Sequence, residues 1–209
     1  MTDSFKESLK ADLQARPGRH LIDDSARDAA VLIPIIGGEN PSLIFTVRTE
    51  TLPSHKGQIS FPGGSIDLGD ESSEAAALRE AHEEIGLDPN SVEVLGRLDS
   101  MHTFVSGYVV TPVIGWIEEQ PELKPNEAEV AQILQIPLAD LAEEIRSEPG
   151  FENQGRTLPT EAWIWDDQVI WGVTAKIVRT FLERLAEIGL GEAPGETSTP
   201  WPEISRTPR

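Results

Sequence analysis

The sequence predicts a mixed α/β fold from two kinds of apolar pattern. Runs rich in β-branched and aromatic residues occur at 29–36 and 42–49, with a Gly/Asn/Pro turn between them at 37–41, and such runs are typical of strands. Apolar residues at helical spacing occur through 173–188 and predict an amphipathic helix. A chain of 209 residues is long enough to form one domain with a sizeable core.

The other elements follow from composition and spacing, in chain order. We expect a surface helix at 3–14, a short extended piece at 58–61, strands at 92–102 and 108–118, a loop at 121–126 and a short helix at 138–147. Two apolar stretches, 163–165 and 169–171, flank polar residues and predict a hairpin. The last stretch, 191–209, is rich in Pro, Gly, Ser and Thr, a composition that predicts disorder.

One further helix carries three carboxylates on a single face. Glu80, Glu83 and Glu84 stand at positions i, i+3 and i+4, which brings their Cβ atoms to roughly 5–6 Å of one another. The apolar positions of this helix fall on another side, at Leu78, Ala81 and Ile85. The helix has three N-cap candidates before it and two stop signals after it: Asp70, Ser72 and Ser73, then Gly86 and Pro89.

The carboxylate face has two interpretations. A glutamate-rich helix face is usually only solvated surface. However, three like charges this close together destabilise a helix that is packed on its other side, unless a cation lies among them. Hard oxygen ligands of this kind suit Mg²⁺ or Mn²⁺, and a glycine loop, Phe61-Pro62-Gly63-Gly64, precedes the helix. We therefore expect a metal site used in phosphate chemistry.

The segment from Gly64 to Leu87 resembles the signature of the Nudix hydrolases, Gly-x5-Glu-x7-Arg-Glu-U-x-Glu-Glu-x-Gly-U, where U is aliphatic. Seven residues separate Glu71 from Arg79, as in that pattern, but six rather than five separate Gly64 from Glu71. We expect Arg79 to pair with Glu71 and to orient the loop. In the alternative alignment Asp70 takes the place of the glutamate, and the extra residue falls at the start of the helix.

The similarity extends over roughly residues 28–188 and is closest to the coenzyme A pyrophosphatases of that superfamily. The upstream segment matches their additional signature at Arg48 and at His55-Lys56-Gly57-Gln58, although Pro53 stands where that signature has a second Arg. We expect this segment to contact the substrate. His55 alone has an equally good structural interpretation, as a hydrogen-bonding group. Downstream, the segments 108–115, 126–130, 136–138 and 170–175 are also similar to that subfamily.

The resemblance implies an α-β-α sandwich around a mixed sheet, with an N-terminal helical segment at 1–27, the Nudix domain at 28–190 and a tail at 191–209. It also implies hydrolysis of the coenzyme A diphosphate to 3′,5′-ADP and 4′-phosphopantetheine. Glu80, Glu83, Glu84 and the carbonyl of Gly64 would hold Mg²⁺ or Mn²⁺, and Glu83, Glu84 or Glu129 would accept a proton from water. The alternatives are another nucleoside diphosphate derivative, such as NADH or ADP-ribose, and a non-catalytic nucleotide-binding module.

Composition narrows the range of partners and locations. Acidic residues exceed basic ones, 36 to 17, for a net charge of −19, which argues against nucleic acid as a partner. The chain has no cysteine, its first residues lack the apolar core of a signal peptide, and its longest apolar run, 29–36, is too short to span a bilayer. We therefore expect a cytoplasmic protein with a small-molecule nucleotide substrate and no membrane partner. Tryptophans 163, 165 and 171 are expected to pack in the core or on a strand face rather than to hold an adenine.

Overall fold

The computed structural model describes residues 2–50, 57–103, 107–143, 145–153, 156–165 and 168–194. The elements up to the middle of the chain are α1 (Thr2–Ala15), β1 (Arg27–Ile36), β2 (Ser42–Arg48), β3 (Ile59–Ser60), β4 (Gly63–Ser65), α2 (Ser73–Ile85), a 3₁₀ turn (Pro89–Ser91), β5 (Val92–Arg97), β6 (Met101–His102) and β7 (Tyr108–Ile117). The remaining elements are β8 (Val130–Pro137), α3 (Leu138–Glu143), β9 (Ile145–Asn153), β10 (Arg156–Trp165), β11 (Gln168–Trp171) and α4 (Gly172–Glu187).

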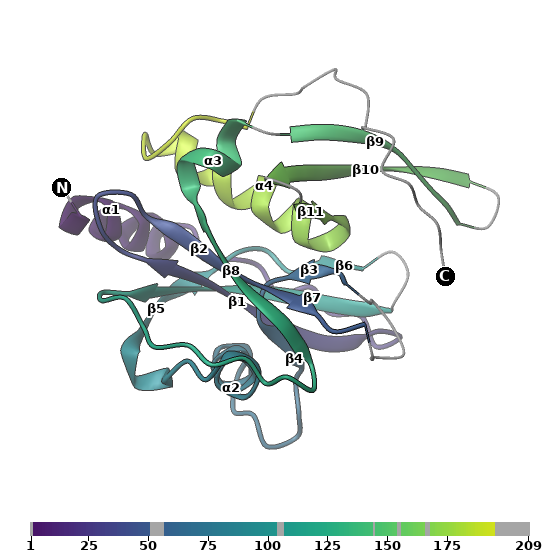
Figure 1. The fold of residues 1–209 in the computed structure, drawn as a ribbon, viewed down its shortest axis with the longest axis horizontal. Helices are drawn as coiled ribbons and strands as arrows, with labels where there is room; N and C mark the ends of the chain where they lie inside the picture. Colours follow the sequence, from purple (N-terminus) through teal and green to yellow (C-terminus); the bar gives the residue numbers. More distant parts are fainter. Residues whose placement is uncertain are drawn as a thin grey trace.

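An eight-stranded mixed sheet forms the centre of the fold, with the path β3-β2-β1-β7-β5. Strand β1 runs parallel to β7 and antiparallel to β2 and β4, while β8 pairs with the other edge of β2. Helix α2 lies on one face of the sheet, and α4 lies on the other with the three-stranded sheet β11-β10-β9 (Figure 1). The expected α/β sandwich around a mixed sheet is therefore confirmed.

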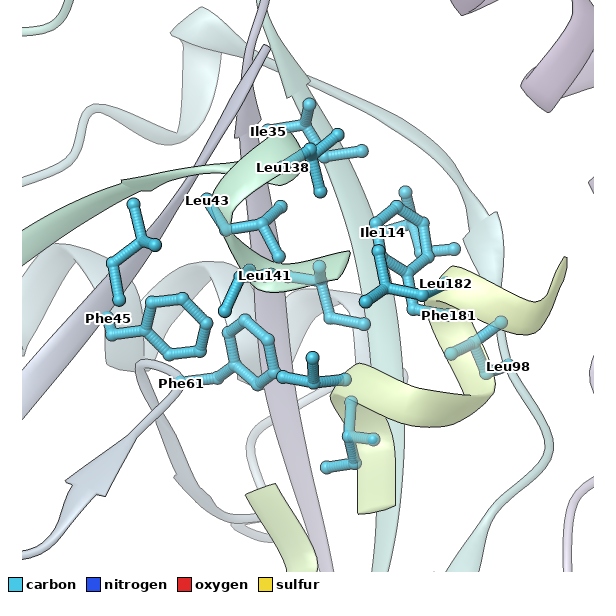
Figure 2. Packing of buried hydrophobic residues seen from close by; sticks show 14 of the residues in the cluster. Ile35, Leu43, Phe45, Phe61, Leu98, Ile114, Leu138, Leu141, Phe181 and Leu182 are labelled. Carbon is cyan, nitrogen blue, oxygen red and sulfur yellow. The ribbon is translucent and has the colours of Figure 1, made fainter. Parts of the chain in front are cut away.

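Two apolar clusters fill the space on either side of the sheet, because alternate strand residues face opposite ways. On the α2 face, Leu32 of β1 packs with Ala81 and Ile85. On the α4 face, Ile35 of the same strand belongs to a larger cluster with Phe181 and other residues, seen in Figure 2. The rings of Phe45 and Phe61 stack there, with centroids 4.5 Å apart. Helix α2 is thus packed against β1 and lies beside β4.

Several expected elements are confirmed and others need correction. The strands at 29–36 and 42–49, the hairpin of β10 and β11, and the helix through 173–188 are all present. The expected strand at 92–102 is wrong as one element, because it is interrupted between β5 and β6. The expected helix at 138–147 ends at residue 143, and β8 and β9 were not anticipated.

Helix α1 is present, but the expectation that it lies only on the surface is wrong. Leu9 and Leu13 are buried in the cluster on the α4 face. Asp12 bonds to Arg184 of α4 at 2.6 Å, with both side chains largely buried, so α1 is joined to the core by apolar and ionic contacts.

The proposed boundaries at 27/28 and 190/191 remain predictions, and most of the expected disordered tail, 195–209, lies outside the described residues. Within the described part of the chain, no helix combines the length and apolar character needed to cross a membrane.

Candidate active site

Backbone pairing fixes strand β4, and caps define the two ends of helix α2. Gly63 and Gly64 pair with Val31 and Ala30 of β1. Of the three candidate N-caps, Ser72 takes this position and its hydroxyl accepts a hydrogen bond from the Ala75 N–H at 3.2 Å. Gly86 ends the helix with a φ of 68°, a left-handed conformation that favours glycine.

Arg79 pairs with Asp70, so the expected pairing with Glu71 is wrong. Nε and Nη2 of Arg79 donate to the two carboxylate oxygens of Asp70, each at 3.0 Å. Asp70 is fixed in turn by the Asp67 N–H, at 2.9 Å from Oδ2, while Glu71 is exposed. Because five residues separate Gly64 from Asp70, the alternative alignment holds at this position: the extra residue lies between Asp70 and the helix.

The same guanidinium also contacts two of the three carboxylates on the helix. Nη1 of Arg79 lies 2.9 Å from Glu80 Oε1 and 3.0 Å from Glu83 Oε2, and Nη2 donates to the carbonyl of Ser65 at 3.2 Å. One arginine therefore connects the loop after β4 to the acidic face of α2, and its charge offsets part of the repulsion there.

Glu84 is the carboxylate that the fold buries, with 5% of its surface exposed. The N–H of Gly63 lies 3.3 Å from its Oε2. The pKa of Glu84 is raised to about 7, mainly by burial and also by the charges of Glu80 and Glu129, while the Gly63 N–H and the Arg48 charge act to lower it. The structure thus brings Glu80, Glu129 and Arg48 close enough to Glu84 to affect its ionisation.

Glu80 lies directly against the backbone of Gly64. A Cβ atom placed on Gly64 would be 2.6 Å from the carboxyl carbon of Glu80, so only a glycine leaves room for this approach. Burial raises the pKa of Glu80, as do the charges of Glu83 and Glu129, and Arg79 lowers it. Residues of the predicted site therefore meet where β4 faces α2.

Glu129 reaches this place from a distant loop. The N–H of Asn126 donates to the carbonyl of Glu84 at 2.8 Å, which ties the loop before β8 to the last turn of α2. The N–H of Thr49 donates to the carbonyl of Glu129 at 2.9 Å. The sequence analysis named Glu129 as a candidate base. The contact between its loop and α2 could not be predicted, because it joins residues far apart in the chain and leaves no local signal in the sequence.

Arg48 lies at the end of β2, opposite Val130 of β8. Its Nε is buried and has no hydrogen-bond partner among the residues that the structure describes. The N–H of Arg48 donates to the carbonyl of Gln58 at 3.0 Å, and the N–H of Gly57 donates to the carbonyl of Arg48 at 3.2 Å. Arg48, Gly57 and Gln58 of the predicted substrate-binding set are thus adjacent, whereas residues 51–56, including Pro53, His55 and Lys56, lie outside the described residues.

The residues fit a divalent cation by charge and ligand type. Glu80, Glu83 and Glu84 supply hard carboxylate oxygens, which Mg²⁺ and Mn²⁺ prefer. A cation would also stabilise the negative charges that the fold buries here. In the described residues no three acidic, histidine or cysteine side chains converge as they stand on one metal position. Glu80 and Glu83 point to Arg79 instead, so a metal would have to draw these carboxylates away from the guanidinium.

Comparison with known proteins was consistent across sequence and structure. A family model described as the NUDIX domain matches residues 26–159. A protein of Enterobacter sp. (strain 638), called "Uncharacterized Nudix hydrolase NudL", is 39% identical over 166 residues, covering 78% of this chain and 84% of that protein. A protein of the same name from Escherichia coli (strain K12 / DH10B) is 42% identical over 155 residues, covering 73% and 80%.

Among solved structures, a MutT/nudix family protein from Enterococcus faecalis aligns with a TM-score of 0.53 at 12% identity, covering 90% of this chain and 75% of that one. At this identity the likeness concerns the fold alone.

Proposed function

Since the chain belongs to the Nudix family, we propose that it hydrolyses the diphosphate of coenzyme A, or of a coenzyme A derivative, with Mg²⁺ or Mn²⁺ as cofactor. The products are 3′,5′-ADP and 4′-phosphopantetheine. That the chain is a Nudix hydrolase follows from the family model and the relatives; the substrate and the metal are the proposal.

The observation that supports the proposal best is the buried Glu84 between the Gly63 N–H and two further carboxylates. A carboxyl with 5% exposure and a pKa raised to about 7 costs stability in the absence of a positive charge. Strongly shifted groups of this kind occur at functional sites more often than elsewhere. Because it lies beside a glycine loop, Glu84 is well placed to act on a phosphate-containing ligand.

In this proposal Glu80, Glu83 and Glu84, with the carbonyl of Gly64, would hold the metal. The cation would supply charge neutralisation for the diphosphate and its leaving oxygen, and acidification of a water molecule. Glu129, or one of the helix glutamates, would accept the proton of the attacking water.

Arg48 contributes a positive charge near Glu84, whose pKa this charge lowers. Its buried Nε, which has no partner within the described part of the chain, would donate to a phosphate oxygen of the ligand. Arg79 has a positioning role, because it joins Asp70 to the carboxylates of α2.

A substrate panel tests the proposal. Purified protein with Mg²⁺ or Mn²⁺ is given coenzyme A, acetyl-coenzyme A, NADH, ADP-ribose and nucleoside triphosphates, and products are identified by mass. We expect the highest kcat/KM for coenzyme A or its acylated form. A clear preference for NADH or ADP-ribose would reject the coenzyme A assignment and retain the hydrolase, and no turnover of any nucleotide would favour a non-catalytic module.

Variants of the helix carboxylates test the metal site. Glu83→Gln and Glu84→Gln should each lose most activity while the fold is retained, and a chelator should abolish the wild-type activity. Glu71→Gln is the matched control, because it removes a charge from an exposed residue just before the same helix. Full activity in both helix variants would rule out the proposed site.

A further inference from the structure

The segment that leads into β8 is bonded to the C-terminal end of α2. The N–H of Lys124 donates to the carbonyl of Ile85 at 2.9 Å, and the N–H of Asn126 donates to the carbonyl of Glu84 at 2.8 Å. The last carbonyls of a helix have no partner within the helix, so these two bonds satisfy groups that α2 leaves free. In Figure 1 the chain between β7 and β8 accordingly passes alongside α2. The backbone of Asn126 is thereby held against the helix residue whose carboxyl the fold buries.

Asn126 also organises the turn that follows it. Its side-chain Oδ1 accepts a hydrogen bond from the N–H of Ala128 at 3.2 Å. Its backbone carbonyl accepts bonds from the N–H groups of Glu129 and Val130, at 2.9 and 2.8 Å, so three consecutive N–H groups point back to this one residue. A side-chain oxygen that accepts from the N–H two residues further on is typical of asparagine and aspartate in turns.

The other side of this turn is fixed to the end of β2. The N–H of Thr49 donates to the carbonyl of Glu129 at 2.9 Å, and the hydroxyl of Thr49 donates to the carbonyl of Ala128 at 3.3 Å. Thr49 is buried and directly follows Arg48, so this anchor is itself part of the packed sheet. The turn is therefore bonded to both α2 and β2, and Glu129 is an exposed residue at its end.

These bonds connect Glu129 to the helix through one residue. The N–H of Glu129 bonds to the carbonyl of Asn126, and the N–H of Asn126 bonds to the carbonyl of Glu84. The charge of Glu129 raises the pKa of both Glu80 and Glu84, as expected of a carboxylate near the acidic face of α2. A group that takes part in the chemistry has to be held to within about 0.5 Å, and an exposed side chain on a turn is only as well placed as the turn itself.

We infer that Asn126 is a positioning residue for the hydrolysis: its side-chain oxygen fixes the turn that directs the Glu129 carboxylate toward the carboxylates of α2. The inference rests on the proposed function in taking Glu129 as the group that accepts the proton of the attacking water. It does not depend on which nucleotide is hydrolysed.

The test is a double-mutant cycle on kcat, measured with Mn²⁺ and the best substrate of the panel. The variants are Asn126→Ala, Asn126→Asp, Glu129→Gln and the double variant Asn126→Ala/Glu129→Gln. Alanine removes the side-chain acceptor and keeps the backbone N–H that bonds to Glu84, whereas aspartate keeps an acceptor oxygen. The control is Asn90→Ala, because Asn90 is an exposed asparagine in the 3₁₀ turn after α2. Melting curves establish that each variant is folded.

We expect Asn126→Ala to lower kcat about tenfold, with KM and the Mn²⁺ affinity measured by calorimetry unchanged. Asn126→Asp should recover most of this loss, and Asn90→Ala should keep the wild-type kcat. Glu129→Gln should lower kcat at least about hundredfold. Adding Asn126→Ala to Glu129→Gln should change kcat by less than about twofold, because a residue that acts through another has no further effect once that other group is gone.

Several results would overturn the inference. They are an unchanged kcat in Asn126→Ala, no recovery in Asn126→Asp, or losses that multiply in full in the double variant. A fall in Mn²⁺ affinity as large as the fall in kcat would show that Asn126 acts through Glu84 instead. Full activity of Glu129→Gln would also overturn it, while the proposed hydrolysis would stand with a helix glutamate as the base. A preference for NADH or ADP-ribose in the substrate panel would reject the coenzyme A assignment without changing these ratios.

Discussion

Replacing Glu84 by glutamine removes a charge that the metal-free fold buries at a cost. Burial is the main cause that raises the pKa of this carboxyl from its ordinary value of 4.5 to about 7. The folded protein therefore holds the Glu84 proton more tightly than the unfolded chain does. Glutamine has no charge to bury, and its side-chain carbonyl can still accept the hydrogen bond that the Gly63 N–H now donates.

The size and sign of the effect follow from linkage. The pKa difference corresponds to about 3 kcal/mol of unfolding free energy. Because the folded-state pKa is above the unfolded one, the penalty is absent well below pH 4.5, grows as the pH rises from about 4.5 to about 7, and is complete above that. At pH 8, Glu84→Gln should thus be more stable than the metal-free wild type by up to about 3 kcal/mol, a rise in Tm of roughly 6–12 °C for a chain of this size.

The assay is thermal unfolding with a chelator at pH 5 and pH 8, for the wild type, Glu84→Gln and the control Glu71→Gln. The stabilisation of Glu84→Gln should shrink strongly at pH 5, where the folded wild type already carries the proton. Glu71→Gln changes the net charge equally but affects an exposed residue, so it should follow the wild type at both pH values. Added Mn²⁺ should raise the Tm of the wild type more than that of Glu84→Gln.

Two results would refute this reasoning. One is a Glu84→Gln variant that melts at or below the wild type at pH 8 without metal. The other is a stabilisation of the same size at pH 5 and pH 8, because a constant difference would come from packing rather than from the ionisation of Glu84.

The remaining predictions concern the loop before α2. Asp70→Asn should lower kcat at least about tenfold by weakening the bidentate bond to the arginine of α2, while Glu71→Gln stays near the wild type; steady-state kinetics of both variants decide between the two alignments. Gly64→Ala should reduce activity far more than Tm, because its Cβ would displace the flexible carboxyl of Glu80. Gly63→Ala should instead lower the Tm, by several degrees in a thermal melt, because its Cβ would lie 2.4 Å from a backbone carbonyl of β1.

Local sequence signals predicted the helix of the site well. The Ser72 and Gly86 caps and the carboxylates at i, i+3 and i+4 depend on residues a few positions apart, which a linear pattern records. The predicted partner of Arg79, Glu71, was wrong because two acidic residues, Asp70 and Glu71, are adjacent in the sequence. A turn bond from the Asp67 N–H fixes Asp70 and leaves Glu71 in solvent, and this difference depends on backbone geometry.

Pairing between distant segments was harder to predict. Strand β8 is half exposed, and its buried positions do not alternate strictly, so the pattern that signals a strand is weak there. The place of β8 is set by its pairing with residues Ser42 to Arg48 of β2. The position of Glu129 beside the helix depends on this pairing and on the bond from Asn126 to the last turn of α2, both of which join residues far apart in the chain.

The contacts of Arg79 explain how three carboxylates share one helix face without a metal. Arg79 bonds to Glu80 and Glu83, whereas the hydrogen bond of Glu84 in the described part of the chain comes from a neutral backbone N–H. Consistent with this division, the large increase in pKa falls on Glu84. Since the guanidinium already compensates the charges of Glu80 and Glu83, a bound cation would interact most favourably with Glu84. Loss of the Glu84 carboxylate should therefore weaken metal binding more than loss of the exposed Glu83 carboxylate.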